Sequence, residues 1–67
     1  MKNGDTIKLI HKDIPTMEPI PVIYRHEERR HYQPYMIITV NGEVYECQKH
    51  SRKNEIMFRG AFYNVTA

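Results

Sequence analysis

The segment Tyr35–Gln48 constrains the fold more than any other, because it holds two β-prone runs separated only by Asn41-Gly42. This dipeptide readily adopts the positive φ angles of a type I′ turn, whose twist matches that of the strands it joins. The sequence therefore predicts a central β-hairpin with a two-residue loop at Asn41-Gly42.

A two-residue loop also predicts which residues face each other across the hairpin. On one face, expected to be the core face, the pairs are Val40 with Glu43, Ile38 with Tyr45, and Met36 with Cys47. On the other face, the pairs are Thr39 with Val44, Ile37 with Glu46, and Tyr35 with Gln48. The second face mixes apolar and polar residues, so we expect it to be partly exposed.

The N-terminal third of the chain predicts two more strands. Asp5–Lys12 alternates apolar and polar residues as a half-buried strand does. Pro15, Pro19 and Pro21 punctuate the segment that follows. Because proline cannot donate a hydrogen bond to a sheet, these residues predict a loop and then an edge strand around Ile20–Tyr24.

The C-terminal residues Glu55–Arg59 and Ala61–Val65 are predicted to form two short strands, or one strand bent at Gly60. No segment shows the 3.6-residue period of an amphipathic helix. We therefore predict one all-β domain over residues 1–67, a small five-stranded barrel or half-open sandwich of the SH3-like or OB-like kind. The opening Asn3–Ile7 is similar to the Gly-Asp lead-in that often begins the first strand of SH3-like barrels.

Composition predicts a folded, soluble protein, since 40% hydrophobic and 27% charged residues are ordinary globular proportions. The first residues contain no signal-peptide core, so we expect a cytoplasmic location and no membrane partner. The single cysteine, Cys47, cannot form an internal disulfide, and its place on the core face of the hairpin predicts a buried thiol.

Catalytic and metal sites are not expected. The chain has no glycine-rich phosphate loop, no serine nucleophile elbow and no carboxylate pair at interpretable spacing, so we predict neither an enzyme nor a cofactor. His26 and His31 are five residues apart, whereas two zinc ligands on one helix face need a separation of four. No metal is predicted.

The segment Arg25–Tyr35, RHEERRHYQPY, is interpreted as an exposed, charged connection between strands and as the best candidate for a working surface. Tyrosine and arginine are enriched in protein interfaces, and mixed charge orients a partner. We expect a non-catalytic module of adaptor or inhibitor type that docks onto a protein, a role common among small phage and mobile-element products. The expected partner-binding residues are Arg25, Arg29, Arg30, Tyr32 and Tyr35.

Two alternatives remain open. Small β-barrels bind single-stranded nucleic acid with cations on phosphates and aromatic rings on bases, although Glu27 and Glu28 interrupt the basic run. The possible nucleic-acid contacts are Arg25, Arg29, Arg30, Lys49, Arg52 and Lys53. The other alternative is a structural subunit that associates with itself or with its neighbours in an assembly.

Overall fold

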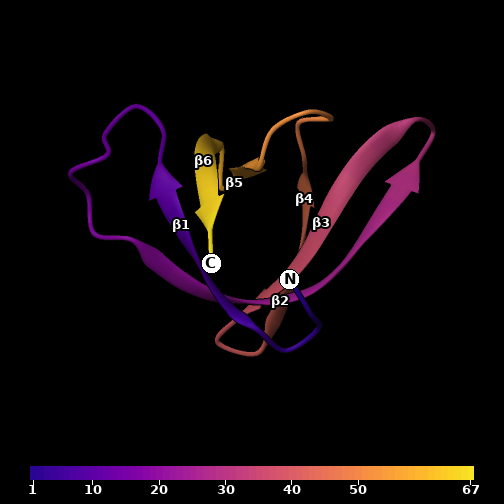
Figure 1. The fold of residues 1–67 in the computed structure, drawn as a ribbon, viewed down its shortest axis with the longest axis horizontal. Helices are drawn as coiled ribbons and strands as arrows, with labels where there is room; N and C mark the ends of the chain where they lie inside the picture. The colour runs from indigo at the N-terminus through magenta and orange to yellow at the C-terminus, as the bar shows by residue number, and fades with distance from the viewer.

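The computed structural model describes residues 1–67 and contains six antiparallel β-strands and no helix. The strands are β1 (Thr6–His11), β2 (Ile20–Arg30), β3 (Gln33–Val40), β4 (Glu43–Gln48), β5 (Glu55–Phe58) and β6 (Ala61–Thr66). Figure 1 shows β2 curving beneath the other strands, which rise from it on both sides. No helix of the length and apolarity needed to cross a membrane is present.

The strands form one sheet in the order β4-β3-β2-β1-β6-β5, which curls until its two edges approach each other. The edges meet at a single bridge between Lys49 and Ile56, where the His50 N–H donates to the Glu55 carbonyl at 2.9 Å. Farther along this seam between β4 and β5, Arg59 donates a hydrogen bond to the Tyr45 hydroxyl at 3.1 Å. The protein is therefore a small, nearly closed, all-β barrel, as the sequence predicted.

The number of strands is six, one more than the five expected. Of the two alternatives for the C-terminal segment, two separate strands are correct, because Arg59 and Gly60 both have positive φ and reverse the chain. The central hairpin is confirmed residue by residue: all six predicted pairs, from Tyr35 with Gln48 to Val40 with Glu43, are present.

The prediction of an edge strand at Ile20–Tyr24 is wrong, because β2 lies inside the sheet between β1 and β3. Pro21 is tolerated there for a local reason. It pairs with Lys8 of β1, whereas the pairing of β2 with β3 begins only at Ile23. The missing N–H of Pro21 thus falls where β2 has a neighbour on one side only.

The interpretation of RHEERRHYQPY as a connection between strands is also wrong. Arg25–Arg30 continues β2, Gln33 begins β3, and only His31 and Tyr32 form the turn. Two paired strands satisfy each other's backbone groups while leaving both faces open to solvent, so a run of charged side chains is compatible with strand structure here. We call residues Arg25–Tyr35 the arm; it is the hairpin that projects at the upper right of Figure 1.

The core lies inside the curl of the sheet. Its residues alternate along all six strands: Ile7, Leu9, Val22, Tyr24, Met36, Ile38, Cys47, Ile56, Phe58, Tyr63 and Val65. The Phe58 ring packs edge-on against the rings of Tyr45 and Tyr63, with centroids 5.1 and 5.8 Å apart. The contact between Tyr45 and Phe58 joins the two ends of the sheet, since Tyr45 belongs to β4 and Phe58 to β5.

A β-bulge at Arg25 determines which charges of the arm face outward. Tyr24 pairs with Ile38, but the next paired residue of β2 is His26, opposite Ile37, so Arg25 has no partner on β3. The extra residue reverses the alternation of faces. Beyond it, Glu27 shares the inner face with Met36, whereas Glu28 lies on the outer face with Tyr35.

Candidate functional site

The tip of the arm is a two-residue turn built from residues that do not favour it. His31 and Tyr32 have φ angles of 49° and 67°, the left-handed values that a type I′ turn requires at both central positions. The other two tight turns, Asn41-Gly42 and Arg59-Gly60, have the same pattern of φ but carry glycine second. A bulky side chain in this conformation costs of order 1–3 kcal/mol.

Burial does not account for this choice of residue. Tyr32 is 93% exposed, the highest value among the large hydrophobic side chains of the chain. Its backbone carbonyl accepts a hydrogen bond from Arg29 Nη1 at 3.3 Å, a bond that any residue at this position would accept. Neither the local backbone preference nor packing therefore selects a tyrosine at the tip.

The outer face of the arm is held by an ion-pair network centred on Arg30. Its guanidinium contacts Glu28 Oε1 at 2.8 Å and both carboxylate oxygens of Glu46 at 2.9 Å. Since Arg30 lies on β2 and Glu46 on β4, this contact crosses β3. Arg30 also lies over the Tyr35 ring, 5.2 Å from its centroid. The network fixes the arm to the rest of the sheet through three strands.

Arg30 also perturbs the acids that surround it. Hydrogen bonds from Arg30 lower the pKa of Glu28 and of Glu46 below their ordinary value. His26 Nε2 lies 3.5 Å from Glu28 Oε1. Because its charge is matched by two carboxylates, Arg30 has little attraction left for an external anion.

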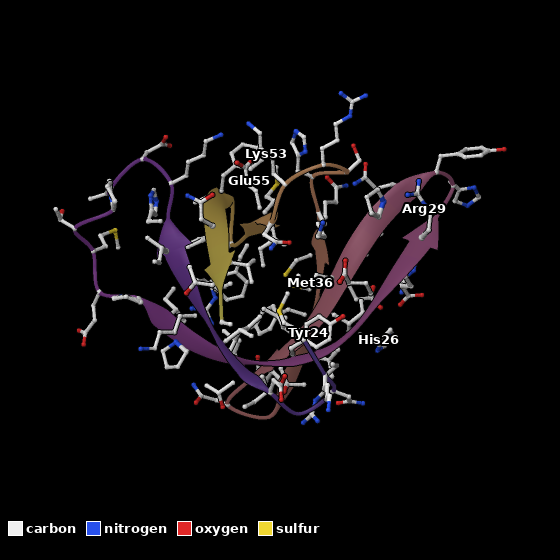
Figure 2. All side chains as sticks on the ribbon, viewed as in Figure 1. Tyr24, His26, Arg29, Met36, Lys53 and Glu55 are labelled. Atoms are coloured by element: carbon white, nitrogen blue, oxygen red, sulfur yellow. The ribbon has the colours of Figure 1, made fainter.

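The inner face of the arm meets the mouth of the barrel. The Tyr24 hydroxyl donates to Glu27 Oε2 at 3.2 Å, and burial together with this carboxylate raises the pKa of Tyr24. Lys49 Nζ lies 3.9 Å from Glu27 Oε1. Figure 2 shows Tyr24 and Met36 inside the curl of the sheet and Arg29 farther out on the arm.

Lys49 organises the loop between β4 and β5. Its ammonium, with only 13% of the side chain exposed, donates to the backbone carbonyls of His50 and Lys53 at 3.1 and 3.2 Å. The Arg52 N–H donates to His50 Nδ1 at 3.0 Å within the same loop. The loop is thus held in one shape, with Arg52 and Lys53 exposed and paired with no carboxylate.

A pocket of about 130 Å³ lies on the outside of the seam between β4 and β5. Met57 and Phe62, a cross-strand pair on β5 and β6, form its apolar part. Its other residues are Gln33, Gln48, Lys49, His50 and Glu55. We call this site the seam pocket. It exists because a single bridge joins the two edge strands, so their outer side chains do not meet.

Glu55 is the one charged residue that the fold buries, at 7% exposure. Lys12, directly after β1, compensates the charge, with its Nζ 3.0 Å from Glu55 Oε1. The same ammonium lies 5.8 Å from the centroid of the Phe62 ring. Figure 2 shows Glu55 directly below Lys53, at the end of the barrel to which the arm also rises.

The structure divides the predicted site residues into two groups. Arg25, Arg29, Arg30, Tyr32 and Tyr35 lie along the arm, where Arg30 and Tyr35 are in contact and Arg25 donates to the Asn3 side chain at 3.2 Å. Arg52 and Lys53 lie on the β4–β5 loop, whereas Lys49 points into the barrel mouth. The arm and the loop are adjacent, since Gln33 of β3 donates to the Lys49 carbonyl at 3.2 Å.

Sequence reasoning missed the seam pocket. The matching parity of Met57 and Phe62 across the Arg59-Gly60 turn was the available signal, because it places two large apolar side chains on the face opposite Ile56 and Tyr63. Their exposed fractions are 39% and 45%. The sequence pattern alone does not show that β4 and β5 approach each other, and it is this approach that brings Gln48 and His50 to the pocket formed by Met57 and Phe62.

Two further kinds of side chain bear on chemistry: the residue types that can bind a metal ion, and the single cysteine, Cys47. No group of three or more histidine, cysteine, aspartate or glutamate side chains is arranged to hold a metal ion. Cys47 is buried opposite Met36, as predicted, and burial raises the pKa of its thiol to about 11. A thiol with such a pKa is almost entirely protonated near neutral pH.

Comparison of the chain with protein-family models, with curated proteins and with solved structures found no match.

Proposed function

We propose that this protein is a non-catalytic binding module that docks onto a protein partner through the arm. The observation that carries the proposal is the tip, where an almost fully exposed tyrosine occupies a strained turn position that glycine would fill at lower cost. Backbone strain retained without a packing reason is a feature of ligand-contacting segments. Tyr32 is therefore the proposed anchor.

The rest of the arm suits this role. Tyrosine and arginine dominate the energetically important positions of protein interfaces, and Arg29 lies beside Tyr32 with no carboxylate partner of its own. Arg30 and Tyr35 act in this proposal by stiffening the arm, through the contacts with Glu28 and Glu46. A rigid hairpin loses little conformational entropy on binding, which favours affinity. We take the module to act in the cytoplasm, where an unpaired thiol stays reduced.

The test is affinity capture from extracts of the source cell, with retained proteins quantified by mass spectrometry. Tyr32→Ser should weaken capture of the partner by at least about tenfold, because truncating an interface hot spot costs about 2 kcal/mol or more. Val44→Ser is the matched control, since Val44 is also exposed, at 64%, but lies on β4 away from the arm. Equal retention by the wild type and the Tyr32 variant would place the interface elsewhere.

Nucleic acid is the second candidate, and one observation favours it. Four of the six predicted contacts, Arg25, Arg29, Arg52 and Lys53, carry charges that no carboxylate neutralises. Arg30 and Lys49 are engaged with carboxylates, which leaves fewer free cations than the sequence suggests. In an amide NMR titration with single-stranded oligonucleotides, this candidate requires shifts at these four free cations that weaken steeply as salt is raised. A spectrum without such shifts would eliminate it.

A further inference from the structure

We infer that the seam pocket binds an aromatic side chain of an acidic peptide segment. This inference rests on the proposed protein-binding role and assigns it a second contact point, distinct from Tyr32. The pocket and the arm belong to one continuous surface, because Gln33 both lines the pocket and follows Tyr32 in the chain.

The size and lining of the pocket indicate the side chain. Its volume of about 130 Å³ is close to that of an engineered apolar cavity of about 150 Å³ that accepts a benzene ring. Met57 offers a thioether and Phe62 a ring, and both groups pack favourably against an aromatic side chain. A large part of both side chains stays open to solvent, with 39% of Met57 and 45% of Phe62 exposed.

The polar wall suits an extended peptide backbone on either side of that ring. Gln48 makes no hydrogen bond through its side-chain amide, so both its donor and its acceptor are available. The Gln33 amide nitrogen is used by the carbonyls of Pro34 and Lys49, which leaves its oxygen as an acceptor. His50 accepts at Nδ1, so its neutral ring presents an N–H at Nε2.

The charges around the pocket indicate which charge the peptide residues beside the aromatic side chain should carry. Lys12 is paired with Glu55, and Lys49 with Glu27, so these four charges cancel. Arg52 and Lys53 do not line the pocket, but they lie in the loop that directly follows its residues Lys49 and His50, and they remain unpaired. Lys49 holds this loop in place through the His50 and Lys53 carbonyls. Acidic residues next to the aromatic side chain meet this excess of positive charge, whereas basic residues are repelled.

The experiment is an amide NMR titration of the full chain with three synthetic seven-residue peptides. The first has a central phenylalanine flanked on each side by aspartate and glutamate. The second replaces the phenylalanine by serine, and the third replaces the four acids by lysines. The first should shift the amides of Gln48, His50, Met57 and Phe62 and should bind at least about tenfold more tightly than either control.

Variants connect this binding to the pocket. Phe62→Thr keeps a strand-forming residue at an exposed position and should weaken binding of the first peptide by at least about tenfold, with Val44→Thr as the unchanged control. Arg52→Ala with Lys53→Ala should weaken binding and reduce its dependence on salt. Tyr32→Gly should leave peptide binding at the pocket unchanged. Evidence against docking through the arm can therefore be distinguished from evidence against peptide binding at the pocket.

The inference is overturned by equal binding of the acidic peptide and either control peptide, by shifts that do not include Met57 and Phe62, or by no binding at peptide concentrations of about 1 mM. A ten-nucleotide thymidine strand serves as a polyanion of another class. If it binds at the same residues more tightly than the acidic peptide, the pocket and the adjoining loop are a nucleic-acid surface and the inference is wrong.

Discussion

Replacing His31-Tyr32 by Asn-Gly should make the fold more stable while removing the proposed anchor. A left-handed conformation costs an L-residue about 1–2 kcal/mol, and glycine avoids this cost. Glycine in turn loses about 0.5–1 kcal/mol through the greater freedom of the unfolded chain. No buried contact is lost, because Tyr32 is 93% exposed. From the middle of each range, the net gain is about 0.75 kcal/mol, and a domain of this size gains about 4–8 °C in Tm per kcal/mol, so Tm should rise by about 3–6 °C.

The assay is thermal unfolding followed by circular dichroism, and the chain supplies its own reciprocal control. Gly42 has φ of 83°, and a Cβ added there meets no atom within 4 Å, so Gly42→Tyr introduces backbone strain without a steric clash. That variant should lose about 0.75 kcal/mol, because the strain is partly offset by the smaller freedom of the unfolded chain. If Gly42→Tyr is destabilised but the Asn-Gly variant has an unchanged or lower Tm, Tyr32 contributes to stability and the argument from strain fails.

Three further predictions concern stability and reactivity. Leu9→Ala, at a fully buried position, should cost about 2–5 kcal/mol in urea unfolding, and a loss below 1 kcal/mol would show that the core closes around the missing atoms. Arg30 lowers the pKa of Glu28 and Glu46 in the folded protein. As pH falls, these carboxylates therefore take up protons in the unfolded chain before they do so in the folded protein. The free energy of unfolding should decrease below about pH 4.5, and less steeply in Glu46→Gln. Identical acid-unfolding curves for the two proteins would contradict this. Burial raises the pKa of Cys47 to about 11, so a thiol reagent should label Cys47 only as fast as the protein opens. Stability should decrease above about pH 9, because the thiol of the unfolded chain ionises there while the thiol of the folded protein stays protonated. Rapid labelling of the folded protein would refute the buried thiol.

The candidate site was only partly predictable. The sequence drew attention to Arg25–Tyr35, and the structure gives this segment an exposed tyrosine and arginines, but as a hairpin instead of a loop. Charge and turn-forming residues suggested a connection, whereas the pairing of two strands satisfied the backbone and kept the chain extended. The sequence contained no glycine or asparagine at His31-Tyr32 that would have indicated a tight turn.

The tertiary structure also changes the roles of particular residues. Arg30 and Lys49 have the same formal charge as Arg29 and Arg52 and are indistinguishable from them in the sequence. In the fold, Arg30 is neutralised across β3 by Glu46, and Lys49 caps backbone carbonyls at the mouth of the barrel. Which cations stay free depends on neighbours that are distant along the chain.

The sequence by itself determined the all-β class, the Asn41-Gly42 hairpin with its complete register, and the burial of Cys47 opposite Met36. These features follow from turn chemistry and the two-residue period of a strand, which act between residues close in the chain. The bulge at Arg25, the interior position of β2 and the seam pocket were decided only by the tertiary structure. They arise when the sheet curls until β4 approaches β5, and that closure depends on packing among side chains from all six strands.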